Sequence, residues 1–222
     1  MTAPATGHGL DGVADAGAFL ARLVRLDPAI LVRLRPVPGA ARTALWARLP
    51  WDVLVVRTVP GTAPGDATVA ASELLAELSA GGDALPRRRD DGWRWPLPPA
   101  ASRAVEALPA TEVQRIAAAA AGTLREASTH GVAGRAVGQR VLRDALLDHV
   151  AVVVTPDDAP DAPVEVPQRL VQGLVRMGFL GTGDVQVRVA GRWVGLVGPY
   201  GAAWSRKAAE LALTPTRGHP NG

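Results

Sequence analysis

The sequence of 222 residues contains no cysteine, one lysine, one tyrosine and two phenylalanines. The absence of cysteine excludes disulfide bonds, thiolate metal sites and a cysteine nucleophile. No apolar run approaches the roughly 18 residues that a membrane-spanning helix needs. The first residues, MTAPATGHGLDG, have neither the basic region nor the apolar stretch of a signal peptide. We therefore expect a cytoplasmic protein that does not bind membranes, and the sequence leaves its oligomeric state open.

The excess of positive charge is small, although the isoelectric point is 10.4. The formal net charge is +3, and all basic residues except Lys207 are arginine, a bias typical of GC-rich actinobacterial genomes. Few of these side chains titrate between neutral pH and about pH 10, so a small excess is enough to raise the isoelectric point. The excess gathers near the carboxyl end, where residues 185–222 carry five basic side chains and one acidic one.

Hydrophobic periodicity in the first half predicts an α+β unit. Apolar side chains at helical spacing indicate a helix over residues 14–26, and alternation from Ile30 onward indicates strands. We expect a helix–antiparallel meander–helix unit. Its elements are a leader over 1–12, the helix, strands over 30–35, 43–49 and 52–59, a helix over 68–79, and an edge strand over 93–97.

The second half is predicted to be helical and to end in a β-hairpin. We place the boundary at Pro98-Pro99, which gives domains over residues 13–100 and 101–206 and a tail over 207–222. The expected elements are helices over 111–128 and 135–148, a strand over 150–154, a loop over 155–166 and a helix over 167–178.

The hairpin is the most specific structural prediction. Two alternating segments, 185–190 and 193–197, flank Gly191-Arg192, and glycine is preferred at the first position of a type II′ turn. This turn places Val189 opposite Val194 and Val187 opposite Leu196 on one face, with Arg188 and Trp193 on the other.

The helix over 167–178 and the hairpin together suggest a nucleic-acid surface. Gln168, Arg169, Gln172 and Arg176 form a polar stripe, and arginine and glutamine are side chains that reach base edges in the major groove. A helix followed by a basic wing resembles the end of a winged helix-turn-helix domain, in which phosphates hold the wing. That fold has two helices between its first strand and the wing, and here we predict one. The plain alternative is a solvated helix face and an ordinary hairpin.

Aromatic and basic residues cluster at the carboxyl end of the chain. Tryptophan and tyrosine beside arginine are enriched where proteins bind partners. The expected partner-binding residues of this region are Arg188, Arg192, Trp193, Tyr200, Trp204, Arg206 and Lys207. We therefore expect a non-catalytic binding or regulatory protein whose partner is acidic, either a nucleic acid or a protein.

The alternative is an enzyme with a cleft between the two halves. In that case His149 and nearby carboxylates such as Asp148 would act as acid and base. No nucleophile motif, phosphate loop or metal-ligand spacing accompanies them, so we expect no catalytic residues, no metal and no cofactor. The acidic residues Asp157, Asp158, Asp161 and Glu165 are expected in a linker.

Overall fold

A computed structural model describes residues 7–130, 139–156 and 162–207. The first half contains α1 (Val13–Leu26), β1 (Leu31–Pro36), β2 (Arg42–Arg48), β3 (Leu54–Pro60), β4 (Ala67–Ala70), α2 (Ala71–Ser79) and the short 3-10 helix η1 (Asp90–Gly92). The second half contains β5 (Arg103–Leu108), α3 (Ala110–His130), α4 (Gln139–Asp148), β6 (Val150–Val154), β7 (Val164–Pro167), α5 (Gln168–Arg176), β8 (Val185–Ala190), β9 (Trp193–Gly198) and β10 (Gly201–Arg206).

Eight strands form one antiparallel sheet in the order β4-β1-β2-β3-β10-β9-β8-β5. The order is the same from either edge: an edge strand, a three-stranded meander, a second meander and an edge strand. A helix, α1 or α5, precedes each meander, and the last strands of the two meanders pair through Val56 and Ala202. The fold thus repeats a helix–meander unit, although the sequence shows no repeat.

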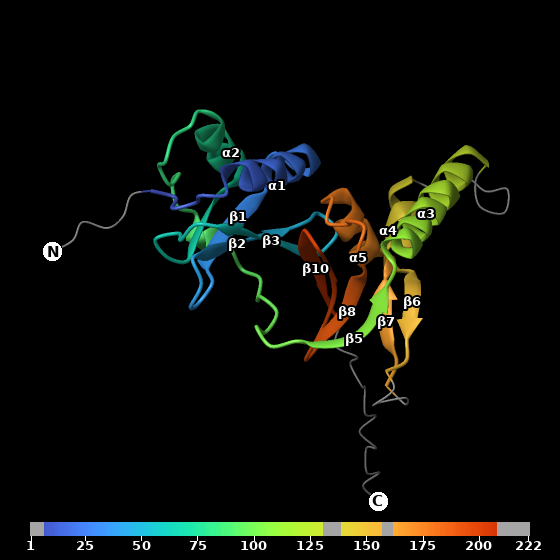
Figure 1. Ribbon diagram of the computed structural model, residues 1–222. Coiled ribbons are helices and arrows are strands. Elements are labelled where there is room, and N and C mark those ends of the chain that lie inside the picture. Colours follow the sequence, from blue (N-terminus) through green and yellow to red (C-terminus); the bar gives the residue numbers. More distant parts are fainter. Residues whose placement is uncertain (1–6, 131–138, 157–161, 208–222) are drawn as a thin grey trace, which may run out of the picture.

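The helices and the sheet enclose one core that extends through both halves. Figure 1 shows α1 and α2 lying over β1–β3, with α5 beside β10. In α1, Phe19, Leu20 and Leu23 are buried because their spacing places them on one side of the helix. The ring of Phe19 stacks on Phe179 from the second half, with 6.1 Å between centroids. The mixed α and β composition and the antiparallel meander expected from the sequence are confirmed.

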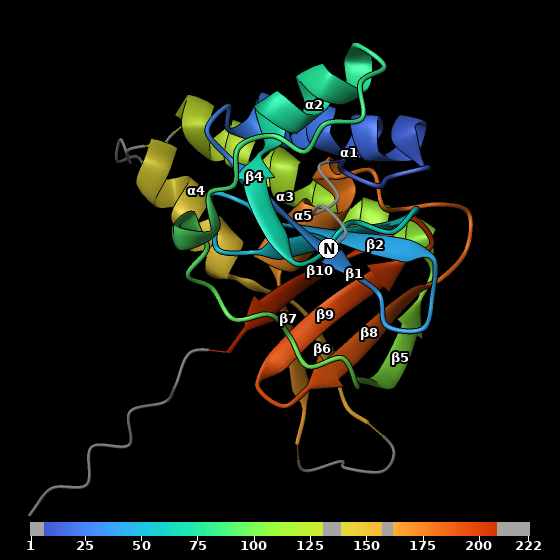
Figure 2. The ribbon, with the colours of Figure 1, turned by 90° about the vertical axis from the view of Figure 1, so that its left-hand side faces the viewer.

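Residues 85–102, which we call the strap, run past the edge strand β4 and then cross part of the opposite face of the sheet. The strap runs across the face turned toward the viewer in Figure 2. Beneath it lies a second hydrophobic cluster of Leu54, Ala190, Trp193, Ala202 and Trp204, against which Trp93 and Leu97 pack. The edge strand expected over 93–97 is wrong, because this segment crosses the face of the sheet, and β5 forms the edge.

The predicted hairpin is present, but it does not project as a wing. The pairs Val189–Val194 and Val187–Leu196 have the expected register, and Gly191 adopts the positive φ of +57° that the first position of a type II′ turn requires. However, β8 also pairs with β5 and β9 also pairs with β10. The hairpin is therefore interior to the sheet, and the winged-helix expectation is not confirmed.

Residues 7–12, expected in a flexible leader, pack against the first half. His8 is buried: its Nδ1 accepts a hydrogen bond from the Leu10 amide at 3.0 Å, and Nε2 lies 3.1 Å from the Gly82 carbonyl oxygen.

The expected 155–166 loop contains β7, which pairs with β6, while residues 157–161 lie outside the described residues. Of the expected tail, Lys207 alone lies within them. One sheet runs through both halves, so the sheet itself marks no boundary between them. The domain boundary near residue 100 therefore stays a prediction.

No helix in the described part of the chain is long and apolar enough to span a bilayer.

Candidate functional site

The residues predicted to bind a partner lie in three different places. Trp193 and Trp204 are buried beneath the strap, with 9% and 7% of their surface exposed, so neither is the exposed aromatic anchor expected. Gln168 is buried as well, and it does not extend the exposed polar stripe predicted for its helix. Sequence patterns could not show these burials, because the covering segments are distant along the chain.

Arg188 forms hydrogen bonds with the end of the strap. Its Nε donates a hydrogen bond to Ser102 Oγ at 2.9 Å, and Nη2 donates to the Ser102 carbonyl oxygen at 2.6 Å. Nη1 donates to Gln186 Oε1 at 2.8 Å. With its donors engaged within the fold, Arg188 holds the end of the strap against β8.

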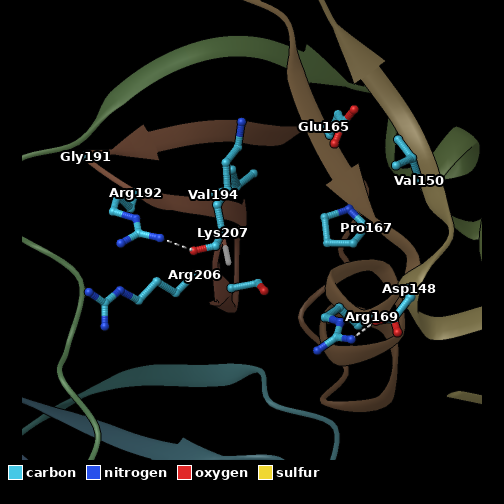
Figure 3. A pocket seen from close by; sticks show the side chains of 11 residues that line it. Asp148, Val150, Glu165, Pro167, Arg169, Gly191, Arg192, Val194, Arg206 and Lys207 are labelled. Atoms are coloured by element: carbon cyan, nitrogen blue, oxygen red, sulfur yellow. Dashed lines mark hydrogen bonds and ion pairs between the residues drawn. The ribbon is translucent and has the colours of Figure 1, made fainter. Parts of the chain in front are cut away.

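Three of the predicted residues, Arg169, Arg192 and Arg206, line one open cavity of about 860 Å³, which we call the basic cavity. Figure 3 shows Arg192, Arg206 and Lys207 on one wall and Asp148, Pro167, Glu165 and Arg169 on the other. The first wall is the end of the sheet, at the β8–β9 turn and the end of β10. The second is the β6–β7 ribbon with the start of α5.

The cations of the basic cavity differ in how they are engaged. Arg169 is largely covered, forms an ion pair with Asp148 and donates to the Trp51 carbonyl oxygen at 3.3 Å. Arg192 is exposed, and its Nη2 donates to the Lys207 carbonyl oxygen at 3.2 Å. Arg206 and Lys207 are exposed, and no carboxylate within the described ranges pairs with either. One wall therefore presents three cations to solvent.

The start of α5 adds a weaker attraction for anions. Pro167, which lines the cavity, is the N-cap residue of α5; no side chain caps this helix end, although the Gln168 amide donates to the His149 carbonyl oxygen at 2.8 Å. The amino-terminal end of a helix carries a partial positive charge. Glu165 lies on the same wall and opposes this charge, so the anion-attracting wall is the one formed by Arg192, Arg206 and Lys207.

Asp148 and Glu165 are the charged residues of the basic cavity that the site prediction missed. Asp148 ends α4, a helix that the sequence pattern predicted, whereas Glu165 lies on β7, a strand that it did not indicate. Lys207, expected with the basic cluster near the carboxyl end, also lines the cavity.

Gln172 and Arg176 turn away from the basic cavity. With Gln168 they line a second cavity, of about 470 Å³, on the side of α5 that faces α3 and α4.

His149 is exposed and lines neither of these two cavities, so they give the acid–base alternative no site. Among the residues that the structure describes, no three His, Asp or Glu side chains are grouped to hold a metal ion.

Comparison with protein families identifies two regions. The family described as domain of unknown function DUF8185 matches residues 97–210. The chain belongs to this family. A second model, domain of unknown function DUF8010, matches residues 9–95. No match is found among curated proteins.

Among solved structures, the chain is similar to bacterial sliding clamps. The DNA polymerase III subunit beta of Bartonella birtlesii, crystallised with griselimycin, aligns over 89% of this chain and 64% of its own, at 13% identity and a TM-score of 0.50. The Caulobacter crescentus sliding clamp aligns over 87% of this chain at 13% identity and a TM-score of 0.49. The chain spans 63% of the length of the Caulobacter protein. The similarity is one of fold.

Proposed function

We propose that this protein is a non-catalytic binding protein that engages an acidic partner at the basic cavity. The observation that carries the proposal is the position of Arg192, Arg206 and Lys207 on one wall of an open cavity of about 860 Å³. The carboxylate of Asp148 is already paired with Arg169, so within the cavity it does not neutralise that wall.

The chemistry of the wall suits phosphate oxygens. Arginine presents a planar fork of donors that matches phosphate and carboxylate oxygens, and lysine adds a compact charge. An open cavity with exposed cations suits a continuous backbone of phosphates better than a fully enclosed small ligand. Nucleic acid is therefore the partner we propose, in preference to an acidic protein.

The similarity of fold gives a reason to begin with duplex DNA. The Bartonella birtlesii protein is a sliding clamp and a subunit of DNA polymerase III. Our proposal rests on the cavity, and the clamp indicates which nucleic acid to try first. Trp193, Trp204 and Arg188 have no part in it, since they hold the strap and its cluster.

The test is binding of a short fluorescent DNA duplex, followed by anisotropy as salt is raised. Each phosphate contact contributes about one to the slope of log affinity against log salt, so Arg192→Ala with Arg206→Ala should lower affinity and reduce the slope by about two. The matched control, Arg35→Ala with Arg42→Ala, removes the same charge from exposed positions on β1 and β2. It should leave both quantities nearly unchanged.

If wild-type protein does not bind the duplex, or if both double variants lose affinity equally, the nucleic-acid proposal is wrong. Salt-dependent binding of polyglutamate at the basic cavity, without binding of DNA, would instead assign an acidic protein as the partner.

A further inference from the structure

A second cavity, of about 470 Å³, lies on the helical side of the molecule; we call it the helical cavity. Its walls come from the end of α1, the turn between β2 and β3, and the helices α3, α4 and α5, which lie together in Figure 1. It contains none of the residues that line the basic cavity. Its volume is within the range of pockets that bind small molecules.

One polar side chain in the helical cavity lacks the hydrogen bond that its burial demands. Gln168 is 3% exposed, and its Nε2 has no hydrogen-bond acceptor among the described residues. Buried donors are nearly always paired, because leaving one unpaired costs the water contacts it has lost. An amide nitrogen can only donate, so the missing partner is an acceptor such as a carboxylate or carbonyl oxygen.

The charges around the cavity favour an anionic acceptor. Arg25, Arg143 and Arg176 line it, against the single carboxylate of Asp144. All three arginines are exposed, so they form a rim through which an anion would be attracted.

The rest of the lining is apolar. Leu26, Leu124 and Leu147 contribute side chains from three helices, and Trp51 contributes an indole from the β2–β3 turn. The Trp51 ring is held in place, since its Nε1 donates to the Arg169 carbonyl oxygen at 3.3 Å. A hydrocarbon or aromatic group would lose its water contacts here without leaving a polar group unpaired.

We propose that the helical cavity binds a small amphipathic carboxylate. Its carboxylate accepts a hydrogen bond from Gln168 Nε2, the arginine rim balances its charge, and its apolar body packs on Trp51 and the leucines. This site is separate from the basic cavity, and the proposal does not depend on DNA binding.

The test uses octanoate as the probe and 1-octanol, which has the same chain and no charge, as its control. Calorimetry should show saturable octanoate binding to the full chain and binding of octanol weaker by about tenfold or more. In NMR spectra, the side-chain amide signals of Gln168 should shift on addition of octanoate, whereas those of Gln114, exposed on α3, should not.

Two variants separate recognition from structure. Gln168→Met keeps the length of the side chain and removes the donor, so octanoate affinity should fall by about tenfold or more. The folded protein should be at least as stable, because an unpaired buried donor is gone. Gln168→Glu should abolish binding by repulsion. Gln114→Met, the same exchange on the exposed face of α3, should bind as the wild type does.

Absence of saturable octanoate binding to wild type would overturn the proposal. So would octanol binding as tightly as octanoate, or folded Gln168→Met and Gln168→Glu proteins that retain wild-type affinity.

Discussion

Gln168 and Arg169 are consecutive residues of α5, and their side chains line two different cavities. Arg169 is held by Asp148 and by the Trp51 carbonyl oxygen, while the Trp51 indole donates back to the Arg169 carbonyl oxygen. The buried stripe of Leu170, Val171 and Leu174 fixes the helix on the sheet. The position of α5 therefore sets part of the wall of each candidate site.

Replacement of Trp204 by alanine should destabilise the protein without weakening DNA binding by the folded molecules. Trp204 is buried in the cluster under the strap, and its ring lies directly over Gly195. Loss of a buried tryptophan side chain costs about 3–5 kcal/mol of unfolding free energy. Urea unfolding followed by circular dichroism measures this cost. Tyr200→Ala, at a half-exposed position, is the control and should cost far less. A folded Trp204→Ala protein with normal stability and lost DNA binding would restore Trp204 as a contact residue.

Replacement of Arg188 by alanine should loosen the end of the strap. The variant loses two hydrogen bonds to Ser102, which together contribute about 1–2 kcal/mol of stability. Hydrogen exchange should become faster across residues 85–102, while DNA affinity should stay at the wild-type value. Arg94→Ala, an exposed position on the same strap, should change neither. Loss of DNA affinity equal to that of the Arg192 and Arg206 variant would show that Arg188 contacts the partner.

The attachment of the strap to β4 should depend on pH through Asp90. Desolvation alone would raise the pKa of Asp90, but hydrogen bonds from the Thr68 amide and the Arg88 guanidinium outweigh it and lower the pKa. A carboxyl group with a lowered pKa stabilises the folded state above its unfolded pKa of about 4, and this contribution is lost as pH falls through the folded pKa. Asp90 is partly exposed, so the effect is modest.

The comparison that measures it is urea unfolding of wild type and Asp90→Asn between about pH 6 and pH 3. Wild type should lose its advantage over Asp90→Asn as the pH falls. Asp91→Asn, at the exposed next position, controls for the loss of a negative charge. A difference between wild type and Asp90→Asn that stays constant over this range would contradict the assignment.

The sequence predicted those strands whose pattern is local. Alternating apolar residues around Gly191 were enough for the hairpin and its register, because turn chemistry and side-chain period agree there. The strand β10 was missed because Gly201, Ala202 and Ala203 give little β signal, and its pairing with β3 joins residues that are remote in the chain. The strand β5 was missed because it follows Pro98-Pro99, which we interpreted as a hinge.

The candidate site was predicted only in part, because local sequence patterns do not show which distant segments pack against each other. Residue type and terminal position singled out Arg192 and Arg206, which line the basic cavity, and their role in binding stays a prediction. Nothing local distinguished them from Trp193 and Trp204, whose burial comes from Trp93 and Leu97 of the distant strap. Likewise, helical spacing placed Gln168 on a polar stripe, but its burial depends on elements that pack around α5.

The most direct test of the central claim is an NMR titration of labelled protein with a short DNA duplex at low salt. Backbone shifts should concentrate at the β8–β9 turn and the end of β10, around Arg192, Arg206 and Lys207, and should disappear as salt is raised. No shifts at all, or shifts confined to other surfaces such as α2 or the strap, would contradict the account.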